Sequence, residues 1–135
     1  MSICGWVKAT STSGGYFFGL SKNSPDFMLY QLNTTNFRLY GGGTYTSNVA
    51  HSIDTSIWHH YAVTYDGTNM TLYIDGAYIN KRASTFNLTS SSYYFIIGAR
   101  DNSSSGFSAH SPNAYYNDIR YYDHCLSAAE VREIS

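Results

Sequence analysis

Residues 58–76 read WHHYAVTYDGTNMTLYIDG, and this stretch decides the fold class of the 135-residue chain. Apolar and polar side chains alternate over 58–65 and again over 70–74, the period of a β-strand with one buried face. Each run stops at an Asp-Gly pair, a combination that suits tight turns between antiparallel strands. The stretch therefore predicts a hairpin within an antiparallel meander.

Runs of the same kind lie on both sides of this hairpin. The expected strands are 2–8, 16–20, 27–32, 37–40, 58–65, 70–74, 93–99 and 115–122. A Ser/Thr-rich connection precedes the seventh, and a polar loop over 101–113, of a length that is often functional, precedes the last. Ser127 followed by Glu130 has the capping-box pattern of a short helix over 127–134. These elements predict an all-β, antiparallel two-sheet sandwich with one short C-terminal helix.

Length and composition further restrict the domain organisation and the possible partners of the chain. A chain of 135 residues fits one domain, taken as 1–135. Charged residues make up 13%, against about 25% in typical domains. The eight Lys and Arg are scattered and the formal net charge is −1, so nucleic acid is not expected as a partner. No apolar run approaches the roughly 20 residues of a membrane span, so membrane insertion is not expected.

Two cysteines, Cys4 and Cys125, stand near opposite ends of the chain. They would form a disulfide if the terminal strands were neighbours with suitable geometry. Otherwise both are expected to act as small buried hydrophobes. The sequence leaves both alternatives open.

Two stretches resemble the laminin G-like and pentraxin-like jelly rolls of the concanavalin A-like lectin/glucanase superfamily. Residues 58–76 are similar to the central hairpin, and 117–127, with Glu130 beyond, to the closing strand and helix. Residues 3–8 and 96–98 match more weakly, in the same order. Family members usually carry further strands before the first and after the last of these segments. We therefore expect either a domain of a longer protein or open sheet edges that a partner covers, such as a second copy of the chain in a homo-oligomer.

The resemblance implies a non-catalytic recognition module that binds glycans or another cell-surface ligand. In bacteria and phages such domains recur in surface and tail proteins, so the expected location is extracellular or virion-associated. The chain shows no signal peptide, and export would then need another route. The alternative is a structural or assembly domain of a virion, such as a capsid decoration or tail subunit, that binds protein partners.

The residues that could carry catalysis favour a binding protein over an enzyme. His59 and His60 are adjacent in a strand, so their rings point to opposite faces and cannot share a metal ion. Glycosidases need a pair of carboxylates around one cleft. The only two glutamates, Glu130 and Glu133, both fall in the expected helix. We therefore expect no enzymatic activity.

Calcium is the cofactor that the resemblance suggests, because some family members hold this ion at the rim of the sandwich. A calcium site needs about six to eight oxygen ligands. Asp101 and Asp118 are the candidate ligands, since the loop over 101–113 leads into the strand that carries Asp118. The alternative for Asp118 is a partner on the backbone or an arginine.

The candidate glycan-binding residues lie in the same region of the chain. Sugars bind to aromatic platforms flanked by polar groups in shallow clefts. The tyrosine pairs near the C-terminus could supply the platforms. The low charge of the residues around them suits neutral glycans or a protein partner better than sulfated glycans. The predicted site comprises Tyr115, Tyr116, Asn117, Arg100, Asp101 and Asn102.

Overall fold

The fold was obtained as a computed structural model that describes residues 1–10, 14–22, 25–42, 44–45, 48–86, 93–102, 106–108 and 112–135. For 25–26, 100–102 and 106–108 the description covers the backbone alone. The strands are β1 (Ser2–Ala9), β2 (Gly15–Ser21), β3 (Pro25–Asn33), β4 (Asn36–Gly41), β5 (Thr44–Tyr45), β6 (Val49–Ala50), β7 (His59–Tyr65), β8 (Asn69–Ile74), β9 (Ala77–Ala83), β10 (Tyr94–Ile97), β11 (Arg100–Asn102), β12 (Gly106–Ser108) and β13 (Ala114–Tyr122). The helix is α1 (Ala128–Glu133).

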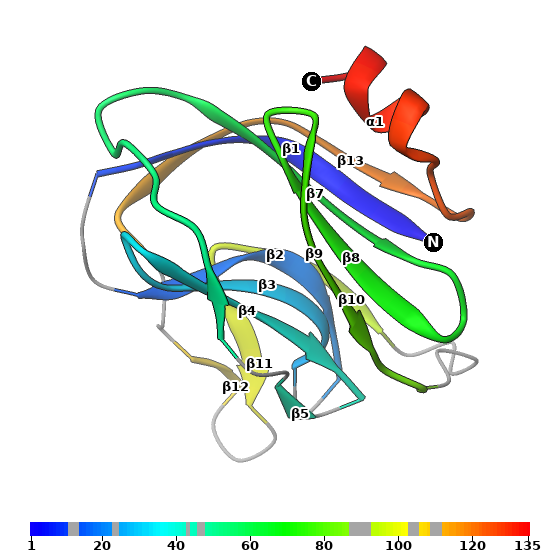
Figure 1. Cartoon of the computed structure of the whole chain (residues 1–135). Coiled ribbons are helices and arrows are strands. Elements are labelled where there is room, and N and C mark those ends of the chain that lie inside the picture. Colours follow the sequence, from blue (N-terminus) through cyan, green and yellow to red (C-terminus); the bar gives the residue numbers. More distant parts are fainter. Residues whose placement is uncertain are drawn as a thin grey trace.

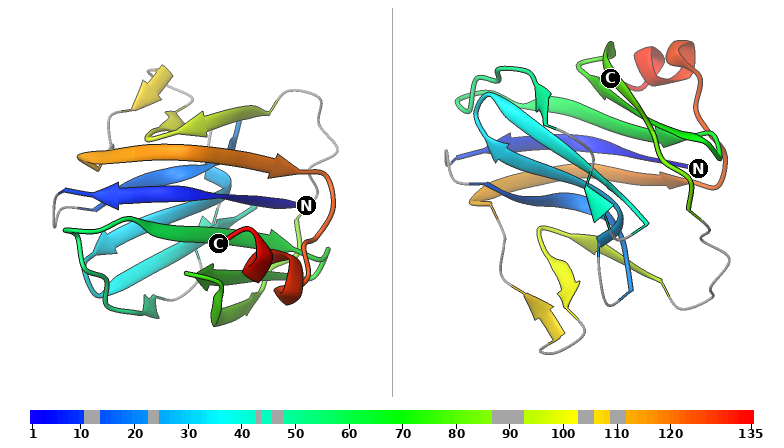
Figure 2. Two further views of the ribbon diagram at one scale, coloured as in Figure 1. Left: turned by 90° about the horizontal axis from the view of Figure 1, so that it is seen from above. Right: turned by 60° about the horizontal axis from the view of Figure 1, so that its bottom comes forward.

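Two antiparallel sheets lie face to face, which confirms the predicted sandwich (Figure 1). The first, called sheet A, has the strand order β13-β1-β7-β8-β9. The second, called sheet B, has the order β10-β2-β3-β4-β5, with β6 also paired to β4. Strands β11 and β12 form a small separate hairpin that projects on the side of sheet B (Figure 2, right). In the described part of the chain, β13 and β9 are therefore the edges of sheet A.

The core lies between the two sheets and follows from the alternation of the strands. Met70, Leu72 and Ile74 all point inward from β8 and are at most 2% exposed. Aromatic rings from the two sheets meet across the interface, with the Phe17 and Tyr61 centroids 5.0 Å apart in an edge-to-face arrangement. Such pairs add specific geometry to the burial of apolar area, so they fix how the sheets stack.

Helix α1 covers the outer face of sheet A (Figure 2, left). It begins with the predicted capping box: Ser127 Oγ accepts the Glu130 N–H, and the Glu130 carboxylate accepts the Ser127 N–H at 2.7 Å. Val131 is fully buried against Cys4 and Tyr73 in a second, smaller core. In the described residues no helix is long and apolar enough to cross a bilayer.

Both Asp-Gly pairs form the tight turns that the sequence predicts. Asp66 Oδ1 accepts the backbone N–H groups of Thr68 and Asn69 at 2.8 and 2.7 Å, which closes the β7–β8 connection. At the β8–β9 turn Asp75 and Gly76 both have positive φ, at 51° and 74°. The aspartates are thus explained by turn geometry.

The structure contains five strands that the sequence does not predict, namely β5, β6, β9, β11 and β12, and one strand boundary differs. The Ser/Thr-rich connection after the central hairpin contains the strand β9, and the polar loop over 101–113 contains β11 and β12. The alternation predicts a strand that starts at Trp58, but β7 begins at His59 and the Trp58 side chain is 41% exposed. Each missed strand is short or lies at an edge, where polar residues obscure the alternation.

The cysteines follow neither expectation fully. Both thiols are free, so the disulfide is not formed. Cys4 is buried beneath α1, as expected for a small hydrophobe, whereas Cys125 is exposed. The pairing fails although β1 and β13 are neighbours, because Cys125 lies beyond the end of β13, on the approach to the helix.

Candidate ligand-binding site

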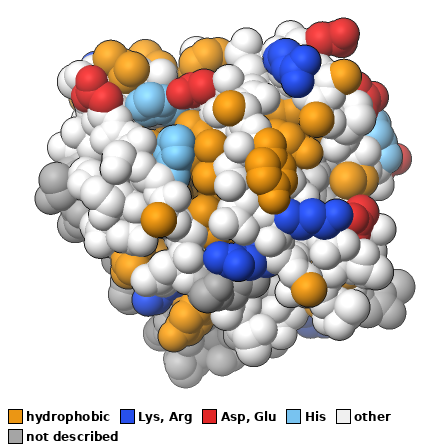
Figure 3. All heavy atoms as spheres, viewed as in Figure 1, with side chains coloured by type: hydrophobic (Ala, Val, Ile, Leu, Met, Phe, Trp, Pro, Cys, Tyr) orange, Lys and Arg blue, Asp and Glu red, His pale blue; other side chains and the backbone are white. Residues whose placement is uncertain are grey.

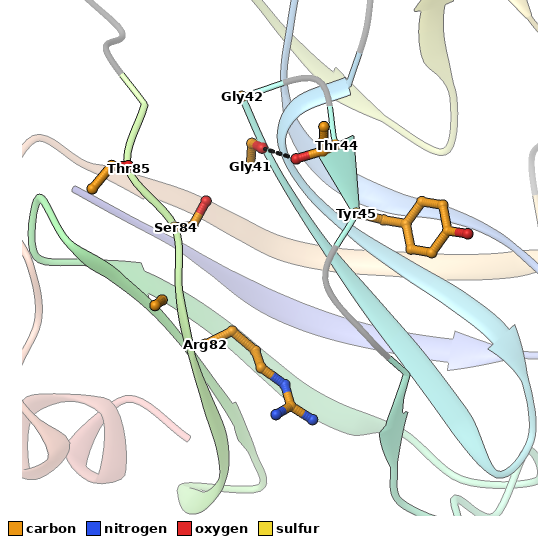
Figure 4. Close-up of a pocket in the computed structure, with 8 residues that line it drawn as sticks. Gly41, Gly42, Thr44, Tyr45, Arg82, Ser84 and Thr85 are labelled. Carbon is orange, nitrogen blue, oxygen red and sulfur yellow. Dashed lines mark hydrogen bonds between the residues drawn. The ribbon is translucent and has the colours of Figure 1, made fainter.

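A pocket of about 450 Å³ opens where the edges of the two sheets meet (Figure 4). One wall comes from the β4–β5 region of sheet B and the other from the end of β9 and the residues after it. In Figure 4 the Tyr45 ring points outward on one side, and the Arg82 side chain lies on the other. The lining residues are Gly41, Gly42, Thr44, Tyr45, Arg82, Ala83, Ser84 and Thr85.

Two adjacent glycines allow the walls to approach each other. A Cβ atom at Gly41 would lie 2.3 Å from Ser84 Oγ and 2.9 Å from the Phe86 ring. A Cβ atom at Gly42 would lie 2.9 Å from Phe86 Cβ, and the φ of this glycine is +61°. Neither position accepts a larger residue without a shift of the opposite wall.

The wall formed by 84–86 is held firmly against sheet A. The Ser84 N–H donates to the Thr68 carbonyl at 2.9 Å. The Phe86 ring stacks on Tyr65 with centroids 4.2 Å apart and planes 16° apart. The Phe86 N–H also donates to the Tyr65 hydroxyl at 3.2 Å. This wall therefore offers a fixed surface to a ligand.

Arg82 brings a positive charge into the pocket. It faces Met70 across the β8–β9 pairing, and Met70 is fully buried, so Arg82 leaves the strand on the inner face of sheet A. The Arg82 Nε is buried and has no hydrogen-bond partner in the described residues. Its neighbour Lys81 points to the opposite face, where its Nζ lies 3.8 Å from Asp66.

No carboxylate lines this pocket among the side chains that the structure describes. The space-filling view shows acidic side chains along the top and the right side of the face, and hydrophobic side chains gathered near its middle (Figure 3). The charge of Arg82 is thus not balanced locally, which favours an anionic group as its partner.

A strip of tyrosines leads along the outer face of sheet B to the rim of the pocket. We call Tyr16, Tyr30, Tyr40 and Tyr45 the tyrosine strip. Successive ring centroids lie 4.8, 6.0 and 5.7 Å apart. Tyr16 is 2% exposed and Tyr45 is 56% exposed, so the strip ends in an open ring.

The Tyr45 ring is held in place on two sides. Tyr40 packs beside it, and the Arg38 guanidinium lies over it, with Cζ 4.4 Å from the ring centroid. Arg38 is itself positioned, because its Nε donates to Asn48 Oδ1 at 2.9 Å. An exposed ring fixed in this way is a preorganised platform for a ligand with an apolar face.

The tyrosines predicted as a glycan site lie elsewhere. Tyr115 and Asn117 are exposed on β13, at the edge of sheet A opposite β9. Tyr116 points inward, and its hydroxyl has no partner in the described residues. Burial raises the pKa of Tyr116 to about 12, so this group stays protonated. The structure therefore brings none of the three to the pocket.

The remaining predicted residues divide between described and undescribed side chains. Arg100, Asp101 and Asn102 form β11, but their side chains lie outside the described part. Asp118 is paired with Arg120, whose Nε donates to Asp118 Oδ1 at 2.8 Å, and this contact lowers the pKa of Asp118. In the side chains described here, no three His, Cys, Asp or Glu gather to hold a metal ion, and calcium at Asp101 and Asp118 stays a prediction.

The two adjacent histidines occupy opposite faces of β7, as predicted. The His59 Nδ1 lies 2.7 Å from Asp75 Oδ2. The His60 ring packs edge-on against Trp6, with centroids 5.3 Å apart. Both rings are therefore engaged in packing and turn contacts.

The sequence reasoning missed the pocket because it missed β9. One signal was available: a tight turn at Asp75-Gly76 requires a returning strand, and Tyr78 and Ile79 just beyond it are good strand formers. The meeting of β9 with the glycines after β4 has no signal in the local pattern, because it joins segments about forty residues apart.

The comparisons with known proteins agree with this architecture. The native heptameric SAP-like pentraxin of Limulus polyphemus superposes with a TM-score of 0.82 at 18% identity, over 98% of this chain and 68% of that one. The CBM40 domain of the Ruminococcus gnavus IT-sialidase, bound to α2,3-sialyllactose, superposes with a TM-score of 0.70 at 17% identity. The match covers 98% of this chain and 80% of that one.

A third similar structure is the binding domain of botulinum neurotoxin DC in complex with rat synaptotagmin II, at a TM-score of 0.65 and 16% identity, over 98% of this chain and 34% of that one. No match was found among curated protein sequences. The family model of the concanavalin A-like lectin/glucanases superfamily matches residues 1–132. The chain therefore belongs to the concanavalin A-like lectin/glucanase superfamily, as a laminin G-like domain.

Proposed function

We propose that this domain is a non-catalytic carbohydrate-binding module that holds a glycan on the Tyr45 ring and in the adjoining pocket. The observation that carries the proposal is the Tyr45 platform, an exposed ring held by Tyr40 and Arg38 at the rim of the pocket. Sugar rings present apolar C–H faces that stack on such rings, and their hydroxyls bind polar groups nearby.

The pocket supplies those polar groups. Thr44 and Ser84, which carry hydroxyls, are among the residues that line it. The Thr44 hydroxyl donates to the Gly41 carbonyl at 3.2 Å, which leaves its oxygen free to accept a bond from a sugar. A shallow site of this kind, with few charged groups, suits recognition rather than bond cleavage.

Two further observations support binding without catalysis. Both glutamates lie on α1, and the Glu130 carboxylate is occupied by the capping box, which lowers its pKa. A similar fold, the CBM40 domain, was determined in complex with a glycan. The proposed setting is a bacterial or phage surface protein outside the cell or on a virion, and the neighbouring genes or the full parent polypeptide would test it.

A glycan array followed by calorimetry tests the proposal. We expect Tyr45→Ala to weaken binding of the best glycan about tenfold, or ~1.4 kcal/mol. The matched control is Tyr115→Ala, which removes a tyrosine of similar exposure, 63%, from the distant edge of sheet A. Loss of binding in the control alone would move the site to the edge predicted from sequence, and an array without any binder would refute the proposal.

A second function, assembly through protein contacts, is favoured by one other observation. Strands β10 and β13 carry exposed apolar side chains, with Phe95, Ile97 and Tyr121 between 43% and 49% exposed. The Phe95 and Tyr121 rings lie 6.5 Å apart, so the two edges form a common apolar surface. Light scattering separates the two functions. A monomer that binds glycans supports the carbohydrate-binding module, and an oligomer that Phe95→Ser dissociates into monomers supports assembly through protein contacts.

A further inference from the structure

We propose that Arg82 makes the pocket selective for glycans that carry a carboxylate. The inference deepens the proposed function and rests on it, because it names the chemical class of the ligand for the same pocket. It departs from the neutral ligand that the low overall charge of the chain suggests.

The pairing of the cations leads to this assignment. Lys81, the residue before Arg82, lies 3.8 Å from Asp66. Arg120 forms a two-point contact with Asp118 at 2.8 and 2.5 Å. Arg82 has no such partner in the described residues, and it lines a pocket without a described carboxylate.

The Arg82 Nε is buried without a hydrogen-bond partner in the described residues, so this donor is shielded from water. A charged donor removed from water loses free energy unless a partner replaces the water. The stem of the side chain leaves the inner face of β9 beside the buried Met70, which limits its freedom of movement. A ligand group that bonds to this guanidinium therefore meets a donor that is already placed.

The shape of the donor favours a carboxylate. A guanidinium is planar and presents paired N–H groups, which match the two coplanar oxygens of a carboxylate. Ser84 lines the same pocket, and its hydroxyl can bond a ring hydroxyl of the acidic sugar. The Tyr45 ring at the rim can then stack on a neighbouring sugar, so acid recognition and stacking are contributed by different residues.

Matched ligand pairs test the proposal. The probes are lactose against 3′-sialyllactose, and a glucose-ended disaccharide against its glucuronic acid counterpart, with 3′-sulfolactose as a non-carboxylate anion. We expect the wild-type domain to bind the acidic member of at least one pair tenfold or more tightly than the neutral member. Sulfolactose is expected to bind more weakly than the carboxylate.

Four proteins are compared by calorimetry: wild type, Arg82→Gln, Arg82→Lys and the control Lys81→Gln. Lys81→Gln makes the same change in net charge one residue away, on the opposite face. Arg82→Gln should lose the preference for the acid, measured as the ratio of the affinities for the acidic and neutral members of a pair. Arg82→Lys should retain part of the preference, and Lys81→Gln all of it.

Several results would overturn the inference. One is a wild-type domain that binds neutral and acidic members equally, and another is equal loss of preference in Lys81→Gln. Sulfolactose that binds as well as sialyllactose would replace carboxylate selectivity with general anion binding. If Arg82→Gln does not fold, Arg82→Lys and the fall of the acid preference between low and high salt decide the question.

The failure of this inference can be told from the failure of the proposed function. A domain that binds glycans through Tyr45 without a preference for acids refutes the role of Arg82 alone. A domain that binds no glycan of the array refutes both.

Discussion

Asp75, in the turn between β8 and β9, contacts His59 at the start of β7, with Asp75 Oδ2 2.7 Å from His59 Nδ1. The other oxygen, Oδ1, accepts the backbone N–H of His60 at 2.9 Å. Asp75 holds this position with a φ of 51°, a conformation that few residues other than Gly, Asn and Asp adopt readily. A single carboxylate thus ties the turn to the start of β7.

Asp75→Ala should destabilise the fold by about 2–3 kcal/mol, because it removes both hydrogen bonds and strains a residue at positive φ. Asp75→Asn should cost less than about 1 kcal/mol, since asparagine tolerates this conformation and keeps an oxygen for the His60 N–H. Urea unfolding of the two variants measures the difference. Equal losses in both variants would contradict the explanation based on turn geometry.

Stability should fall as the pH drops below about 6.5, the ordinary pKa of histidine. Burial is the main factor that lowers the pKa of His60, so the folded chain holds this ring neutral. The unfolded chain binds a proton there more readily, which gives a stability that rises with pH across this range. His60→Asn should flatten the slope of unfolding free energy between pH 5.5 and 7.5.

His51 contributes to the same slope, because burial also lowers its pKa. The His60→Asn variant should therefore keep a reduced slope of unfolding free energy against pH. The double variant His51→Gln/His60→Asn should have a smaller slope still. An unchanged slope in His60→Asn would show that folding does not lower the pKa of this ring.

The two thiols should react at very different rates. Cys4 is buried beneath α1, and burial raises its pKa to about 11, whereas Cys125 is exposed. A chromogenic disulfide reagent at pH 8 should label Cys125 at once and Cys4 only after unfolding. Slow labelling of both thiols in the folded protein, or no labelling of Cys4 after unfolding, would contradict the structure.

Ser127→Ala should reduce stability by about 1 kcal/mol, because it removes the side-chain half of the capping box. It should also speed the labelling of Cys4, since α1 covers that thiol. Ser127→Thr is the matched control, because threonine also caps helices and keeps a hydroxyl that can donate to the Glu130 carboxylate. If Cys4 labelling is the same in all three proteins, the helix does not protect the thiol.

The sequence was sufficient for the elements with local signals. The alternation from His59 to Tyr65, the two Asp-Gly turns and the Ser127–Glu130 box all predict features that the structure contains. These signals are local, because each depends on residues only a few positions apart.

The candidate site depends on contacts that are not local, and this is why it escaped prediction. Arg82 is one position from Lys81 in a polar strand, and only the pairing with Met70 decides which of the two faces inward. The tyrosine pairs near the C-terminus were more conspicuous in sequence. Their strand, β13, nevertheless lies at the far edge of sheet A from β9.

The close approach of Gly41 to Ser84 has a consequence for how this family can vary. A side chain at position 41 would collide with the residue at 84, so the two positions form one steric unit although they belong to different sheets. Homologues that gain bulk at one should lose it at the other, or else separate the sheet edges. Paired substitutions here would let evolution alter the depth of the pocket while the charge of Arg82 stays in place.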